Sequence, residues 1–302
     1  MVPRITVNVP ATTANLGSGF DCLGLALDWW NSITVEPARA FQVKLRGDSQ
    51  GLPADESNMV VEHIRIFYDY IGAPLPTLRV TMTNRIPIGK GFGSSAASLV
   101  GGLLAGNALA GTPLSAQEIL EMANELEGHP DNVSAAIFGG FTISAFDGHR
   151  VVCAAVEPSQ NWRAVVYIPE RALSTKTARN VLPAQISRAD AIFNISRGAL
   201  TAYAFTTQRA GFLQIGMQDR LHQPYRVPLV KGMSEMLDAA CGAGANGAAL
   251  SGAGPSLIAF ATTNAQAARV RAAFVETARK LKLNGETKIL KLSARGAYIA
   301  QA

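Results

Sequence analysis

Apolar and polar residues alternate along several short stretches of the chain. In the first of them, Ile5-Thr6-Val7-Asn8-Val9, an aliphatic side chain takes every second position. A period of two places successive side chains on opposite faces of an extended chain, so such stretches predict β-strands, as do short apolar runs. Together they predict strands at residues 5–9, 41–45, 78–82, 140–145, 151–156, 164–168, 248–250, 257–260 and 297–299.

Other segments carry apolar residues at helical spacing, which predicts helices with a buried face. One of them opens with Ser115 followed by Glu118, a capping-box signature, and is expected to end near Gly128. Helices are predicted at residues 58–70, 94–110, 115–128, 189–206, 230–241 and 265–281.

The order of these elements favours an α+β fold, because strands and helices mix without strict alternation. The pattern restarts after Pro158, so we expect two packed halves, residues 1–158 and 159–302. A length of 302 residues suits two ordinary domains, and 48% hydrophobic residues can supply each with a core.

The composition argues against several classes of protein. No run approaches the roughly 18 apolar residues that cross a membrane, and no apolar signal-peptide segment follows Arg4. The three cysteines, Cys22, Cys153 and Cys241, form no CxxC pair, so neither a disulfide framework nor a zinc site is predicted. We therefore expect a cytoplasmic protein with no membrane partner.

The chain is basic, with a formal net charge of +5 and an isoelectric point of about 9.2. Lysine and arginine are spread along the sequence, and no basic stripe rich in aromatic residues occurs, so we expect no nucleic-acid partner. The excess suits an anionic small substrate such as a nucleotide. A generally basic surface explains it equally well.

A loop rich in glycine and serine, from Pro87 to Ser98, lies between a predicted strand and a helix of small residues. Its glycines allow tight turns and a close approach to a ligand. The helix N-terminus that follows offers free N–H groups and partial positive charge, which suit a phosphate. Ordinary helix capping explains the pattern as well. The loop is neither a Walker A motif, since no hydroxyl residue follows Lys90 directly, nor a GxGxxG fingerprint.

Three segments in the same order resemble the motifs of the GHMP kinases: residues 9–21, residues 87–98 and residues 247–256. Two positions depart from that pattern, because the family usually has leucine at Phe92 and proline at Ser18. The resemblance implies an N-terminal domain akin to ribosomal protein S5 domain 2 and a ferredoxin-like C-terminal domain. It also implies ATP between the domains, on Pro87, Ile88, Gly89, Lys90, Gly91, Phe92, Gly93, Ser94, Ser95, Ala96 and Ala97.

Within the family, the motifs resemble most the homoserine kinase branch, which implies ATP and L-homoserine as partners. Asp21 then belongs near the ammonium and Asn15 near the amino acid. Arg179 and Arg226 belong near the carboxylate, because a guanidinium matches a carboxylate with two hydrogen bonds. A turn-capping role for Asp21 and a surface position for the arginines remain open, with Lys176 and Arg220 as weaker candidates.

The segment 127–133 resembles the one that places a histidine and an asparagine beside the substrate hydroxyl. We expect His129 and Asn132 to position that hydroxyl; Asp131 or His129 could also act as general base. The resemblance implies Mg²⁺ as cofactor, bound by Ser95 and Glu121, with Ser94 and Glu125 as alternatives that the sequence barely separates.

Three other functions stay open: another GHMP kinase acting on mevalonate, phosphomevalonate or shikimate, a binding protein of the same fold without activity, and an RNA-associated module. A homodimer is also left open by the sequence.

Overall fold

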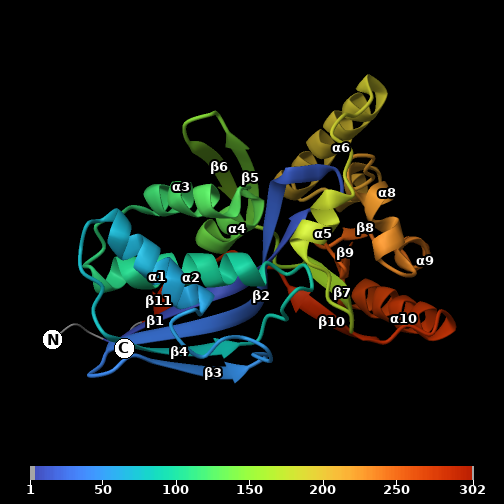
Figure 1. Cartoon of the computed structure of the whole chain (residues 1–302). Helices are drawn as coiled ribbons and strands as arrows, with labels where there is room; N and C mark the ends of the chain where they lie inside the picture. The colour runs from blue at the N-terminus through green and yellow to red at the C-terminus, as the bar shows by residue number, and fades with distance from the viewer. Residues whose placement is uncertain (1–3, 301–302) are drawn as a thin grey trace.

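The computed structural model describes residues 4–300, which form two β-sheets with helices packed on them (Figure 1). The outer ends of the two expected halves, residues 1 and 302, lie outside the described residues. In the larger sheet the strand order is β11-β1-β2-β4-β3, and β5 and β6 join it through β2. Its seven strands are β1 (Ile5–Asn15), β2 (Gly19–Pro37), β3 (Gln42–Gly47), β4 (Leu78–Asn84), β5 (Phe141–Phe146), β6 (Val151–Val156) and β11 (Tyr298–Ala300).

The smaller sheet is antiparallel and has the order β10-β7-β9-β8. Counted along the chain, its first strand, β7, lies between the fourth, β10, and the third, β9. Helices follow the first and the third strands. This is the ferredoxin-like arrangement, so the expectation for the C-terminal half is confirmed. The strands are β7 (Arg163–Pro169), β8 (Gly247–Leu250), β9 (Leu257–Ala261) and β10 (Gly285–Lys291).

Helices of the N-terminal half cover one face of the larger sheet, as Figure 1 shows. They are α1 (Met59–Tyr70), α2 (Ser94–Leu109), α3 (Ala116–Glu127) and α4 (Asp131–Phe138). The predicted capping box is present, with Ser115 and Glu118 bonded to each other's backbone at the start of α3. Helix α2 is apolar all round because it is packed between α1, β1 and α4.

Helices of the C-terminal half lie beside the smaller sheet and toward the cleft between the halves. The helices of this half are α5 (Thr175–Asn180), α6 (Arg188–Thr206), α7 (Leu213–Gly216), α8 (Gln223–Arg226), α9 (Met233–Gly242) and α10 (Asn264–Lys280), with short 3₁₀ turns at Ala210–Phe212 and Val227–Leu229. None of the helices in residues 4–300, in either half, is long and apolar enough to cross a membrane.

The two halves share one hydrophobic core. Phe141 of β5 stacks on Phe205 of α6 with ring centroids 4.6 Å apart, and Trp162 and Phe260 complete the aromatic cluster. The chain passes from one sheet to the other after β6, where residue 158 lies, and β11 then returns to pair with β1. The last strand therefore closes the first sheet, as the sequence predicted, and a site between the halves has a packed support.

Candidate active site

The three motif segments meet in the structure. Phe92 in the glycine loop accepts a backbone hydrogen bond from Thr12 in β1 (3.1 Å). On the other side of the loop, the hydroxyl of Ser251 donates to the carbonyl oxygen of Gly91 (2.7 Å). The loop is thus held between the first and third motifs, which lie more than 230 positions apart in the sequence.

Glycine is required at the centre of this contact. Gly91 and Gly93 both have left-handed φ angles, +82° and +64°. A Cβ at Gly91 would collide with the carbonyl oxygen of Ser251, and one at Gly93 with the hydroxyl of Thr12. Gly93 is the N-cap of α2 and no side chain caps this end, so the first N–H groups of the helix are left for a ligand.

A cavity of about 110 Å³ opens at this helix end and between the halves. Most residues that the sequence singled out line it, whereas Pro87, Ile88, Lys90, Phe92, Ala96, Ala97 and Glu121 do not. The predicted residues that line it are Asn15, Asp21, Gly89, Gly91, Gly93, Ser94, Ser95, His129, Asp131, Asn132, Arg179 and Arg226. The structure therefore brings these residues, far apart in the sequence, together around one cavity.

Asp21 and Arg179 form an ion pair across the cavity. The guanidinium of Arg179, on α5, donates from both terminal nitrogens to the two carboxylate oxygens of Asp21, at 3.0 and 2.5 Å. The ring of Phe20 lies 5.4 Å below this guanidinium. Both side chains are partly exposed, and each charge is engaged by the other at the cavity wall.

Arg226 is the other cation of the cavity, and only 1% of it is exposed. Its guanidinium donates to neutral acceptors: the carbonyl oxygens of Ala178 (3.1 Å) and Gly252 (3.3 Å) and the ring of His222 (3.0 Å). Among residues 4–300 no carboxylate lies within ion-pair distance of it. Burial and then the charge of Arg179 lower the pKa of Arg226 to about 10, so it is still a cation at neutral pH.

Asn15 holds the wall of the cavity. Its amide nitrogen donates to the carbonyl oxygen of Gly252 (2.9 Å), and its amide oxygen accepts from the backbone N–H of Asp21 (3.0 Å). Asn15 and Asp21 both have left-handed backbone angles. The amide is thus engaged within the protein and sets the direction in which Asp21 points.

His129, Asp131 and Asn132 sit where α3 ends and α4 begins. His129 Nδ1 and Asp131 Oδ1 are 2.7 Å apart, and the same oxygen accepts the backbone N–H of Asn132 (2.7 Å). Burial lowers the pKa of His129, but the hydrogen bond and charge of Asp131 outweigh it, so the pKa is raised. The side-chain oxygen of Asn132 accepts from the hydroxyl of Thr12 (2.8 Å), which fixes it beside the glycine loop.

Ser95 and Glu121, the predicted Mg²⁺ ligands, do not line the same cavity. The carboxylate of Glu121 accepts from the side-chain amide of Gln117 (2.9 Å) and lines a separate surface hollow. Glu127, at the end of the same helix, lines the cavity, and its carboxylate lies 3.5 Å from the hydroxyl of Ser95. Six residues along a helix rotate a side chain by about 240°, so the two glutamates face different ways.

The environment of Glu127 suits a bound cation. Burial raises the pKa of Glu127 and Asp131 adds to the rise, while His129 and the Ser95 hydroxyl counteract it. A half-buried carboxylate beside a hydroxyl offers the hard oxygen ligands that Mg²⁺ prefers. The donor set therefore fits magnesium better with Glu127 than with the glutamate predicted from sequence.

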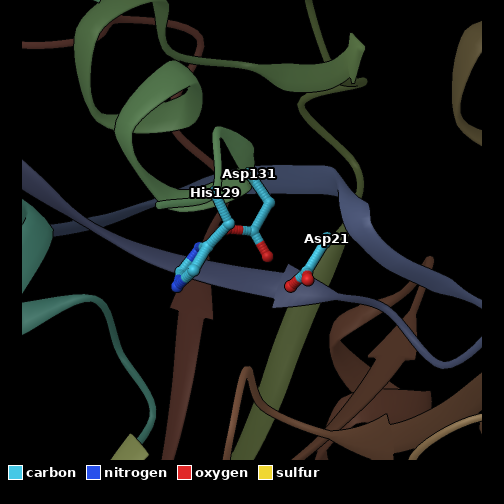
Figure 2. A group of neighbouring side chains, drawn as sticks. All are labelled: Asp21, His129 and Asp131. Atoms are coloured by element: carbon cyan, nitrogen blue, oxygen red, sulfur yellow. The ribbon is translucent and has the colours of Figure 1, made fainter. Parts of the chain in front are cut away.

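A second cluster also has metal-binding spacing, because ligand atoms of Asp21, His129 and Asp131 lie within 4.8 Å of one another (Figure 2). Figure 2 shows the carboxylate of Asp131 between the other two side chains. These atoms already have partners, since Arg179 binds Asp21, and His129 binds Asp131. A cation here would compete with Arg179, so we favour the oxygen pair of Ser95 and Glu127.

Lys90 lies in the glycine loop but does not face the cavity. Its ammonium donates to the carbonyl oxygens of Pro169 (2.8 Å) and Glu170 at the end of β7. The backbone N–H of Leu173 adds a hydrogen bond to the carbonyl oxygen of Gly89 (3.0 Å). The side chain is an anchor between the halves, which agrees with the prediction that Lys90 is no P-loop lysine.

Sequence reasoning missed two residues of the site. It considered Glu127 only as one of three glutamates on a helix, although Glu127 directly precedes the segment with His129. It gave no role to Thr12, whose hydroxyl and N–H join the asparagine of the site to the glycine loop. The position of Thr12 inside the first motif was the available signal.

Comparison with known proteins covers both halves. The profile of the GHMP kinases N terminal domain matches residues 58–140, and that of the GHMP kinases C terminal domain matches residues 203–280. The homoserine kinase of Desulfitobacterium hafniense is 43% identical over 98% of this chain and 99% of its own. That of Synechocystis sp. is 40% identical over 98% of each chain.

Solved structures agree with the sequence matches. The crystal structure of homoserine kinase from Cytophaga hutchinsonii superposes with a TM-score of 0.87 and 28% identity, over 98% of this chain and 97% of that one. L. major mevalonate kinase, at 16% identity and a TM-score of 0.70 over 97% of each chain, shows the same fold. On both family profiles and on identity along nearly its whole length, this chain belongs to the GHMP kinase family.

Proposed function

We propose that this protein transfers the γ-phosphoryl group of ATP to the side-chain hydroxyl of L-homoserine, which gives O-phospho-L-homoserine for threonine biosynthesis. The relatives named homoserine kinase support this proposal. The observation that carries it is the pair of differently engaged cations beside one carboxylate: Arg226 without an anion, and Arg179 on Asp21. Such a set suits a ligand with both a carboxylate and an ammonium.

The amino-acid end of the substrate binds between the two halves. Its carboxylate meets Arg226, whose burial without an ionic partner is unfavourable until an anion arrives. Arg179 supplies a second donor to the same carboxylate. The ammonium of the substrate meets the carboxylate of Asp21, whose backbone N–H is bound by Asn15 at the cavity wall. The domain that we expect at residues 159–302 therefore contributes the carboxylate site.

The triphosphate lies on the glycine loop of the other half, residues 1–158. The open N-terminus of α2 and its serines offer N–H and hydroxyl donors to the phosphates. Ser95 and Glu127 would hold Mg²⁺, which neutralises charge on the transferring phosphoryl group. The protein's own task is to bring the hydroxyl in line with that group.

Asn132 holds the hydroxyl at the transfer point. Thr12 fixes its side chain beside the loop. The hydrogen bond and charge of Asp131 raise the pKa of His129, which favours its protonated form, so we assign it to adding positive charge near the phosphates and not to acting as a base. The carboxylate of Asp131 is hydrogen-bonded to His129 and to the backbone N–H of Asn132, so we assign it to orienting these two residues. The proton of the substrate hydroxyl then passes to a phosphate oxygen.

Substrate analogues test this proposal. ADP release is measured with L-homoserine and with two analogues. One analogue, 4-hydroxybutanoate, lacks the ammonium, and the other, 3-aminopropan-1-ol, lacks the carboxylate. Each lost charge-assisted contact is expected to lower kcat/KM by roughly tenfold to hundredfold relative to L-homoserine. Equal turnover of all three compounds would show that the cavity does not read the amino-acid group.

A further inference from the structure

Two of the three guanidinium nitrogens of Arg226 donate hydrogen bonds within the protein. Its Nε donates to Ala178, and its first terminal nitrogen, Nη1, donates to His222 and Gly252. The second terminal nitrogen, Nη2, has no hydrogen-bond partner among residues 4–300, and Arg226 lines the cavity. Because the guanidinium is planar, the direction of Nη2 is set by the contacts of the other two nitrogens.

His222 lies one helical turn before Arg226 on α8 and is fully buried. Its Nδ1 faces the Nη1 of Arg226 at 3.0 Å, and a guanidinium can only donate. Its Nε2 faces only acceptors, the carbonyl oxygen of Gly17 at 2.7 Å and a carboxylate oxygen of Asp219 at 3.5 Å. Nδ1 must then accept and Nε2 must carry the proton.

The ring of His222 is itself held from two sides. It stacks on Phe20 with centroids 5.2 Å apart. The buried carboxylate of Asp219 accepts the backbone N–H groups of His222 (3.0 Å) and Gln223 (2.7 Å), which fixes the start of α8. A chain of contacts thus runs from Asp219 through the imidazole to the guanidinium of Arg226.

We propose that His222, as the neutral Nε2–H tautomer, is a positioning residue that turns the free Nη2 of Arg226 toward the substrate carboxylate. This inference rests on the proposed function, since it takes Arg226 as the carboxylate site. His222 does not line the cavity, so it acts through Arg226 and not on the substrate. Fixing the planar fork in advance lowers the ordering cost of binding.

Two substitutions separate the functions of the two ring nitrogens. The amide oxygen in His222→Asn takes the place of Nδ1 and can accept from Arg226. The amide nitrogen in His222→Gln takes the place of Nε2, which keeps the contact with Gly17 and removes the acceptor for Arg226. His222→Gln is expected to raise the KM for homoserine by roughly tenfold to hundredfold, as for a lost hydrogen bond to a charged group. His222→Asn should stay near the wild-type value, and neither should change the KM for ATP.

Arg226→Ala is the reference for these variants. It should raise the KM for homoserine, and adding His222→Gln to it should cause no further rise, because His222 acts on the substrate only through its hydrogen bond with Arg226. If Arg226→Ala raises this KM and His222→Gln does not, the inference fails and the proposed function stands. If Arg226→Ala leaves the KM unchanged, the proposed carboxylate site fails first. A loss of kcat and thermal stability alike in both His222 variants would show a structural role only.

The tautomer can be read in the wild-type protein if a variant does not fold. ¹⁵N NMR of the four histidines distinguishes protonated from unprotonated ring nitrogens. For His222 we expect a protonated Nε2 and an unprotonated Nδ1, before and after homoserine is added. A proton on Nδ1 would overturn the inference, because that nitrogen could not accept from Arg226.

Discussion

The carboxylate of Asp21 and the guanidinium of Arg179 bind each other through two hydrogen bonds, at 3.0 and 2.5 Å, although 158 positions separate them. The pair joins β2 of one half to α5 of the other, directly in the cavity. In the proposed complex it opens into two new contacts, Asp21 with the ammonium and Arg179 with the carboxylate. The amino acid thus binds as a zwitterion between two opposite charges.

This relationship predicts the effect of removing either charge. Arg179→Ala should raise the KM for homoserine by roughly tenfold to hundredfold and leave the KM for ATP nearly unchanged, because the substrate carboxylate does not react. Arg179→Lys should recover only part of the loss, since an ammonium cannot make the two-point contact. Steady-state kinetics with each substrate varied checks this. A rise in the KM for ATP, with the KM for homoserine unchanged, would place Arg179 on the triphosphate.

The metal assignment predicts a difference between two glutamates of the same helix. Glu127→Gln should lower kcat by about a hundredfold or more, since loss of even an outer contact of a metal site costs about tenfold to hundredfold. Glu121→Gln is the matched control and should keep wild-type kcat, because Glu121 faces another hollow. Initial rates of both variants at saturating ATP and varied Mg²⁺ decide which glutamate binds the metal. The reverse result would restore the sequence prediction.

The raised pKa of Glu127 also predicts a dependence of stability on pH. A carboxyl group whose pKa is raised by folding favours the folded state fully below its unfolded pKa, near 4.5, and loses this contribution as pH rises through the folded pKa. Without Mg²⁺, Glu127→Gln should therefore have a higher Tm than wild type at neutral pH, and this difference should vanish below pH 4.5.

Thermal unfolding in EDTA across that range measures the difference. Glu125→Gln, which changes an exposed side chain of the same helix, is the control and should show no such trend. A wild-type protein more stable than Glu127→Gln at neutral pH would mean that the carboxylate is already well compensated.

The position of Lys90 predicts that it stabilises the loop and does not bind phosphate. Lys90→Met removes the contacts with Pro169 and Glu170, so it should lower the Tm. The KM for ATP should rise by less than the roughly tenfold expected for a lost charged hydrogen bond to phosphate. An unchanged Tm with a large rise in the ATP KM would put the ammonium on the triphosphate.

Much of the fold follows from local patterns in the sequence. Alternation predicted β3 and β4 and the first part of β1, and helical spacing predicted α1, α3 and α10 with ends within a few residues; β1 runs on to Asn15, six residues beyond its predicted end. The long strand β2 was missed: Leu23 to Leu27 are all buried and show no alternation, although Asn31 to Val35 do alternate in burial. The missed α4 is a single short helix whose burial depends on its neighbours.

The site was predictable as far as motifs carry it. Asp21, Arg179, Arg226 and His129, which the family resemblance singled out, all line one cavity. The choice between Glu121 and Glu127 depends on how α3 is rotated toward the glycine loop, and that rotation is set by tertiary packing. The burial of Arg226 likewise arises from contacts of α8 with residues 178 and 252.

The most direct measurement of the central claim is the identity of the phosphorylated product. The protein is incubated with ATP and Mg²⁺ and with L-homoserine, mevalonate, shikimate or galactose, and ADP release and the ³¹P NMR spectrum are recorded. We predict ADP release that depends on L-homoserine, with a phosphate ester on its side-chain oxygen. Clear turnover of another alcohol without homoserine-dependent ADP release would contradict the account.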